Sequence, residues 1–229
     1  MKQKAIHWIK RFAVYVFGLF IIAFGVSVSK MSDLGVSPVN SIPCVISEIL
    51  QIDMGICTTC VFIGFILLQI LIVQKDFQWK NLLQILCSTL FGSFVSLTNR
   101  IAKMLLPVCS NYGMRLVYVG ISVILVAVGI LLYIEADVLP LPSEGVMQAV
   151  SYKTKLAFST AKLGFDWTVV IISAMLSLIF MKGLVGVREG TVIAAFGVGI
   201  CLKVVTKFLQ TPLRTFLFHD GEGCSKVEV

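Results

Sequence analysis

Two aspartates occupy equivalent places in two related halves of the sequence. Asp33 follows the first long apolar segment, and Asp137 follows the segment that matches it when the chain is shifted by 104 residues. A carboxylate beside an interrupted membrane helix can coordinate a cation or accept a proton. It can also lie at the membrane boundary, where it is solvated or caps the next helix. Because it recurs in both halves, the pair is a candidate ion-binding or substrate-binding site.

A second matched pair follows two matched prolines. Asn40 comes two residues after Pro38, and Glu144 comes two residues after Pro142. Both fall in the first turn of a helix, where free N–H groups and the positive helix end favour an anion or a polar ligand. Glu144 can also satisfy that preference by itself. The nearby hydroxyl groups belong to Ser37, Ser41 and Ser143. We expect the two helix starts to converge on a central polar cavity that a solute crosses.

Lys203 follows the uninterrupted apolar run Thr191–Leu202. At about 1.5 Å per residue it lies about 18 Å along its helix, just past the middle of a bilayer. Its side chain can extend to the inner membrane surface. Otherwise it faces the bundle interior and pairs with one of the acids above. We include it among the candidate substrate-binding or ion-binding residues.

The elements that must position these side chains form an internal repeat. The segments that begin at Arg11 and Arg115 align without a gap. Apolar matches are common by chance in membrane proteins, but Gly25 also aligns with Gly129, as do the aspartates and the prolines. A repeat whose halves are interrupted by Pro and Gly at the same place is typical of transporter folds.

Six segments are apolar over roughly the 20 residues that a helix needs to cross a bilayer. They are residues 12–31, 55–73, 81–101, 115–135, 166–182 and 189–209. Two further segments, Val36–Leu50 and Pro142–Leu156, have a helical pattern but are too short to cross. Proline suits the first turn of a helix, so we interpret both as Pro-led half-helices, either re-entrant or lying in the interface.

These elements predict an all-α polytopic membrane protein built from two inverted three-helix repeats. Each repeat has three spans, an odd number, so the second repeat must enter the membrane from the other side. If the half-helices crossed, the repeats would be parallel instead. The expected parts are a cytoplasmic segment 1–11, repeats 12–114 and 115–210, and a cytoplasmic tail 211–229. Thirteen of the nineteen Lys and Arg residues then lie on the cytoplasmic side, as the positive-inside rule requires.

Composition restricts the class of protein. Hydrophobic residues make up 58% and charged residues 14%, against roughly 25% charged residues in soluble domains. The net charge of +7 is scattered at helix ends, so we expect no nucleic-acid partner. The apolar run that follows the basic N-terminus is long and has no A-x-A-like cleavage site, which favours a retained span over a signal peptide.

No catalytic motif is present in the sequence. We find no P-loop, no H-E-x-x-H and no nucleophile–base pair, so we do not expect an enzyme. Cys57 and Cys60 form a C-x-x-C, but most of the seven cysteines lie in apolar surroundings, where thiols behave as small hydrophobes. The two histidines, His7 and His219, are at opposite ends. We therefore expect no metal and no cofactor, and leave a redox role for the C-x-x-C pair open.

Three short motifs resemble the YczE/YyaS/YitT family of bacterial integral membrane proteins. They are D-L-G-V-S-P at 33–38, its degenerate copy A-D-V-L-P-L-P-S-E-G at 136–145, and R-E-G-T at 188–191. The resemblance covers about residues 11–205. It implies a multi-pass protein of the bacterial plasma membrane, in a family often described as transporters, and it implies no substrate.

Together these features predict a secondary transporter for a small polar or charged organic solute. Coupling to protons or another cation would use Asp33, Asp137 or Glu144. The expected partners are the lipid bilayer and the solute, and a homo-oligomer stays open. One alternative is a non-transporting membrane protein that assists or anchors a partner enzyme, and another is a small channel formed by the duplicated half-helices.

Overall fold

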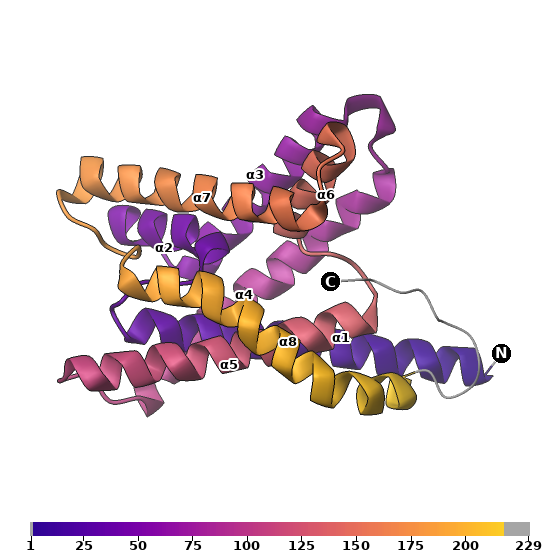
Figure 1. Ribbon diagram of the computed structural model, residues 1–229, viewed down its shortest axis with the longest axis horizontal. Helices are drawn as coiled ribbons and strands as arrows, with labels where there is room; N and C mark the ends of the chain where they lie inside the picture. Colours follow the sequence, from indigo (N-terminus) through magenta and orange to yellow (C-terminus); the bar gives the residue numbers. More distant parts are fainter. Residues whose placement is uncertain (1, 218–229) are drawn as a thin grey trace.

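The structure, a computed structural model, describes residues 2–217 (Figure 1). The described chain is helical and contains no strand. Most of the predicted tail 211–229 lies outside the described residues, as do His219 and Cys224. The part of the tail that is described, up to Leu217, continues the last helix.

Eight α-helices and two short 3-10 helices follow one another along the described chain. They are α1 (Lys2–Met31), α2 (Pro38–Leu50), α3 (Met54–Val73), η1 (Gln74–Asp76), η2 (Trp79–Leu83), α4 (Gln84–Leu105), α5 (Tyr112–Ala136), α6 (Pro142–Thr154), α7 (Phe158–Met181) and α8 (Glu189–Leu217). Six of them are long and apolar enough to cross a membrane, namely α1, α3, α4, α5, α7 and α8. The predicted all-α fold, with six spanning helices and two shorter Pro-led helices, is confirmed.

Several helices are longer than their apolar segments indicated. α7 begins at Phe158 rather than 166, and its first turns hold a Lys162–Asp166 ion pair of 3.1 Å at i,i+4 spacing. α1 begins at Lys2 rather than 12. A helix can continue beyond its apolar segment where i,i+4 side-chain pairs stabilise it, so the end of an apolar segment does not mark the end of a helix.

The first helices of the two halves, α1 and α5, form the centre of the core. They run in opposite directions (Figure 1). A Cβ atom on Gly18 would lie 2.8 Å from the backbone nitrogen of Tyr133, and one on Gly129 would lie 2.8 Å from the carbonyl oxygen of Gly18. Small residues let membrane helices approach until their backbones touch. The glycines therefore determine how closely α1 and α5 pack.

Contacts between α1 and α5 are reciprocal. Gly25 faces Val126, and Gly129 faces Ile22. The shift of 104 residues that relates the halves converts Gly25 to Gly129 and Ile22 to Val126. Two further helix contacts are reciprocal in the same way: α2 packs on α7, and their equivalents in the other half, α6 and α3, pack on each other. Reciprocal contacts of this kind are those of a two-fold axis, and they support the predicted inversion of the repeats.

The last two helices of each half do not follow this two-fold relationship. α3 packs along α4, whereas the equivalent helices α7 and α8 lie on different sides of the molecule (Figure 1). α7 packs on α2 and α6, and α8 packs on α5. Both leave large apolar side chains exposed, among them Trp167, Ile171, Phe196 and Ile200. Exposed apolar faces of this size fit lipid or another membrane helix.

The half-helix α2 begins inside the bundle and returns to the end from which the chain entered. Left-handed backbone at Asp33 (φ 55°) and Gly35 (φ 101°) turns the chain inward after α1. Ser41, in the first turn of α2, touches Ser173 in α7. Glu48, in the last turn, pairs with Lys30 near the end of α1, at 2.8 Å. This path agrees with a re-entrant half-helix rather than a spanning one.

Candidate functional site

The matched aspartates lie at the surface, at opposite ends of the α1–α5 pair. Both adopt left-handed backbone, with φ 55° at Asp33 and 48° at Asp137, directly after their helices end. Their side chains are 68% and 88% exposed. Because α1 and α5 are antiparallel, the structure does not bring the two carboxylates together.

Each aspartate is bound by an arginine of the other half. Arg115 Nη1 lies 2.9 Å from Asp33 Oδ2, and Arg11 Nη2 lies 3.3 Å from Asp137 Oδ2. Arg11 Nε also donates to the carbonyl oxygen of Ala136 at 2.9 Å. Arg188 adds a donor to the carbonyl oxygen of Asp33 at 3.1 Å. These contacts join helix ends of the two repeats, which is a structural role for the pair.

The α2 start, comprising Ser37, Pro38, Asn40 and Ser41, is polar and largely buried. Asn40 Nδ2 donates to Ser37 Oγ at 2.9 Å, while Asn40 Oδ1 is buried without a partner. The Ser41 hydroxyl donates to the Pro38 carbonyl oxygen and lies 2.7 Å from the hydroxyl of Ser173. A buried acceptor without a donor is uncommon in folded proteins. The α2 start therefore has an unused acceptor for a solute or a water molecule.

The α6 start, comprising Pro142, Ser143, Glu144 and Gly145, is held by two glutamines that sequence reasoning missed. Gln69 Nε2 donates to the Pro142 carbonyl oxygen at 2.9 Å and to Gln84 Oε1 at 3.0 Å. Gly145 leaves room for Gln69, because a Cβ at that position would collide with its amide. Both glutamines are almost fully buried. The sequence feature that could have identified them is an amide side chain inside an apolar segment, because a polar side chain there must find a partner.

Unpartnered polar atoms gather around the α6 start. The rings of Tyr15 and Tyr133 meet edge to face at 6.2 Å. Both side chains are buried. The Tyr133 hydroxyl has no hydrogen-bond partner in the described part of the chain, whereas the Tyr15 hydroxyl lies against the Cys87 thiol. Asp166 Oδ2 pairs with Lys162, but its Oδ1 is buried and unpartnered. With Asn40 Oδ1 at the equivalent α2 start, these atoms make up the buried unpartnered polar atoms of the described residues.

Glu144 interacts electrostatically with two of these neighbours, Tyr15 and Lys162. It lies on α6, outside the six spanning helices. Burial raises the pKa of the Glu144 carboxyl above its ordinary value, and the positive charge of Lys162 offsets part of that rise. Ser143 beside it is buried, while part of the Glu144 side chain stays accessible. The α6 start therefore combines an acid with two neighbouring polar groups, the Tyr15 hydroxyl, which also lies against the Cys87 thiol, and the Lys162 ammonium group.

Lys203 does not face the interior, and the expectation that it pairs with an acid inside the bundle is wrong. α8 docks on α5 through Ala194, which packs in one cluster with Val119 and Val123. Lys203 is nine residues further on, about half a turn around the helix from Ala194. Its side chain is exposed. The docking face of α8 therefore directs Lys203 outward.

Glu135 is a buried carboxylate whose ion pair with a half-exposed arginine the repeat could not reveal. Its side chain is 6% exposed, and its Oε2 lies 2.6 Å from Arg214 Nε. Gln210 Nε2 donates to its Oε1 at 2.6 Å. The equivalent residue of the first half is Met31, so the repeat offers no matched pair. The contact fastens the end of α5 to the end of α8.

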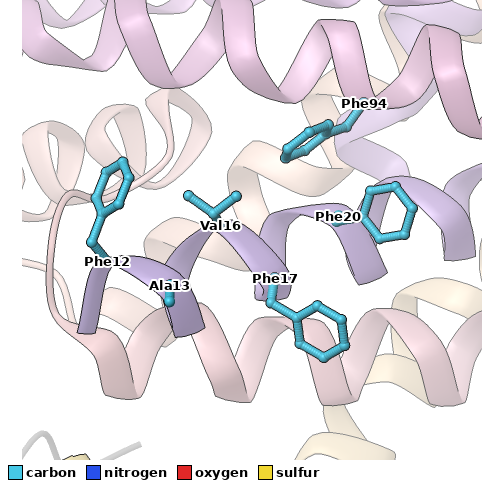
Figure 2. Close-up of a pocket in the computed structure, with 6 residues that line it drawn as sticks. All are labelled: Phe12, Ala13, Val16, Phe17, Phe20 and Phe94. Atoms are coloured by element: carbon cyan, nitrogen blue, oxygen red, sulfur yellow. The ribbon is translucent and has the colours of Figure 1, made fainter. Parts of the chain in front are cut away.

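The hollow that Figure 2 shows is apolar and differs from the central polar cavity that the sequence predicts. It is open along one side of α1, where α4 faces it. Its lining consists of Phe12, Ala13, Val16, Phe17, Phe20 and Phe94. Such a groove suits acyl chains rather than a polar solute. It does not join the two half-helix starts.

The C-x-x-C residues lie on α3 in different surroundings. Cys57 is buried, Cys60 is exposed, and both thiols are free. Beside them, Gly55 packs so closely on α4 that a Cβ would collide with the Gly92 carbonyl oxygen. This segment of α3 therefore serves helix packing, and a redox role for the cysteines stays open.

Comparisons with known proteins agree with the membrane architecture. A family described as "Family of unknown function (DUF6198)" matches residues 9–207. The chain is 25% identical over 207 residues to "Uncharacterized membrane protein YczE" of Bacillus subtilis (strain 168), which covers 89% of this chain and 87% of that protein. No solved structure matches the chain at comparable significance.

Proposed function

Starting from the fact that this chain belongs to the DUF6198 family, whose function is unknown, we propose that it is a secondary transporter for a small polar or charged organic solute. The resemblance to YczE that the motifs indicated is confirmed. The proposal places the chain in the bacterial plasma membrane with both termini in the cytoplasm, as the charge distribution predicts.

The observation that carries the proposal is the pair of helices that begin with polar residues inside the bundle. The starts of α2 and α6 hold matched residues, Asn40 and Glu144, with unpartnered polar atoms in or around both. In transporters built from repeats, substrates bind where interrupted helices expose their ends inside the membrane. Buried polar atoms without partners are expected where a solute or water binds part of the time.

The matched aspartates have a different role in this proposal. Because Arg11 and Arg115 already bind them at the surface, Asp33 and Asp137 join the repeats at opposite ends of the molecule. A transporter needs one end closed while the other opens. The two arginine–aspartate contacts lie where such closures would be made, on the two sides of the half-helix starts.

We also propose that the chain is not an enzyme, since its sequence has no catalytic motif. A membrane partner that assists or anchors another protein is the second candidate. The observation that favours it is the separation of α7 from α8, which leaves apolar faces on both helices exposed. Another membrane helix could pack there.

The test is a ligand screen by thermal unfolding of the purified protein, with a panel of amino acids, organic acids, amines and sugars. A ligand that binds only the folded state stabilises it by about 2.7 kcal/mol at about 100 times its Kd. We expect a hit on the native chain that Asn40→Ala weakens and that the exposed Asn111→Ala leaves unchanged. The hit is then followed as uptake into proteoliposomes.

A hit that binds Asn40→Ala as tightly as the native protein would contradict the assignment of the solute to the α2 start. Absence of any hit, combined with co-purification of one stoichiometric membrane protein that dissociates on mutation of Ile171 or Phe196, would favour the second candidate.

A further inference from the structure

The last helices of the two halves, α4 and α8, dock in the same way on the first helix of their own half. A shift of 107 residues converts Phe94 of α4 to Cys201 of α8. The ring of Phe94 packs on Phe20 of α1. Cys201 packs in one cluster with Val123 of α5. The other faces of α4 and α8 can therefore be compared residue by residue.

A second face of α4 holds the start of α3. Gly92 lies so close to α3 that a Cβ on it would collide with the Gly55 carbonyl oxygen. One turn further along α4, the Ser96 hydroxyl donates to the carboxylate of Asp53, the residue that caps α3. A glycine and a polar residue four positions later thus bind a helix that offers a carboxylate at its start.

The equivalent residues of α8, Gly199 and Lys203, are exposed, and we call them the α8 outer face. The shift of 107 residues converts the glycine and the serine of α4 into this pair. No atom lies within 4 Å of a Cβ added to Gly199. The equivalent of α3 is α7, which packs on α2 and α6 instead (Figure 1). Within the described residues, the α8 outer face is therefore a helix-binding face that holds no helix.

Lys203 gives the α8 outer face a positive charge. Within the described part of the chain its ammonium group makes no ion pair and no hydrogen bond. It follows about 18 Å of apolar helix in a hydrocarbon core about 30 Å thick, so about 12 Å separate its backbone from the cytoplasmic boundary. A charged side chain at that depth is costly and pairs with an opposite charge. The α8 outer face therefore favours a partner that brings a carboxylate.

Neither a second copy of this chain nor a phospholipid matches that requirement as well as another membrane protein does. The acids in the six long helices are Glu135, Asp166 and Glu189, and each is already paired with a basic residue. A phospholipid carries its phosphate at the membrane boundary, to which Lys207 lies one turn closer than Lys203. A helix from another protein can place a carboxylate at the depth of Lys203.

We propose that the α8 outer face binds a transmembrane helix of a partner protein, whose backbone packs on Gly199 and whose aspartate or glutamate pairs with Lys203. The contact reproduces in the second half, with a helix of another protein, the contact that α3 makes with α4 in the first half. It stands whether or not the protein transports a solute, and it gives the chemistry of the partner that the second candidate function requires.

The test measures binding of a designed transmembrane peptide to the purified full chain in phosphatidylcholine vesicles, by energy transfer between labels on the two. The probe is a leucine-rich single span with Asp-x-Gly near its middle, the spacing of Asp53 and Gly55 at the start of α3. The control peptide carries Asn in place of Asp. We expect the Asp peptide to bind about tenfold more tightly than the Asn peptide, as for polar contacts between membrane helices.

Variants of the α8 outer face separate its charge from its packing. Lys203→Met should abolish the preference for the Asp peptide, whereas Lys207→Met, the matched control one turn away, should keep it. Gly199→Leu should weaken binding of both peptides, because its side chain fills the space that a helix backbone needs. All three positions are exposed, so the melting temperatures of the variants should stay close to that of the native protein.

Equal binding of the two peptides, or an unchanged preference in Lys203→Met, would overturn the proposal. Energy transfer between differently labelled copies of the chain, abolished by Lys203→Met, would assign the face to a second copy instead. Displacement of the Asp peptide by phosphatidylglycerol, in the native chain but not in Lys203→Met, would assign it to a lipid headgroup. The transport proposal is read separately, from the solute panel.

Discussion

Arg11 binds the end of the helix that is equivalent to its own. Its guanidinium donates to the Ala136 carbonyl oxygen and pairs with Asp137, while Arg115 pairs with Asp33 at the other end of the α1–α5 pair. The shift that relates the two halves converts one ion pair into the other. The repeat therefore matches both members of the two ion pairs, the arginines with each other and the aspartates with each other.

Removing Arg11 should cost more stability than removing Asp137. The Asp137 carboxylate is 88% exposed, and exposed ion pairs contribute about 0–1 kcal/mol. Arg11 is largely buried and also satisfies a carbonyl group at the end of α5, whose loss costs about 1–3 kcal/mol. Unfolding in denaturant should give Arg11→Ala a clearly lower free energy of unfolding than Asp137→Ala. Equal losses would mean that the ion pair, not the carbonyl contact, holds α5.

The glycines of the α1–α5 contact should be intolerant of any side chain. Gly129→Ala places a methyl group 2.8 Å from the Gly18 carbonyl oxygen, and forced overpacking costs about 1–3 kcal/mol. The matched control is Gly120→Ala on the same helix, where nothing lies within 4 Å of the added Cβ. Alanine favours helix there, by about 1 kcal/mol. Thermal unfolding of the two variants should shift in opposite directions.

Arg214→Ala should destabilise the protein by about 2–3 kcal/mol, because it leaves the buried Glu135 carboxylate without its counter-charge. Glu135→Gln combined with Arg214→Ala should recover part of that loss, since no charge then stays buried. Unfolding free energies of the two single variants and the double variant measure this coupling. Additive losses would show that Arg214 stabilises α8 by another contact.

Both termini should be cytoplasmic. Cysteines introduced as Gln78→Cys and Glu222→Cys, in a chain whose own cysteines are replaced, should stay protected from an impermeant reagent added outside the cell. A cysteine between α4 and α5, at the exposed Asn111, should be labelled under the same conditions. Labelling of position 78 or 222 from outside would refute this orientation.

Residues 11–101 and 115–210 should superpose by a rotation about an axis in the membrane plane. The reciprocal contacts of Gly25 and Gly129 are the reason for this expectation. An experimental structure in lipid is the measurement. We expect α8 to deviate most, because its equivalent α4 packs along α3 while α8 is separated from α7. An axis along the membrane normal would mean that α2 and α6 cross the membrane.

Local sequence pattern determined much of this fold. Apolar length alone indicates the six spanning helices, because each must satisfy its own backbone hydrogen bonds in lipid. Pro38 and Pro142 mark the starts of the half-helices, since proline suits a first helical turn. The match between the two halves is enough to identify four candidate site residues, namely Asp33, Asp137, Asn40 and Glu144.

Contacts between helices were decided only by the tertiary structure. Gln69 of α3 contacts the α6 start and is itself bound by Gln84 of α4. No local pattern relates residues so far apart in the chain. Lys203 shows the same limit. Its helix and depth follow from sequence, but its direction depends on which face of α8 docks on α5. A helix presents side chains all around its axis, and packing chooses the face that is buried.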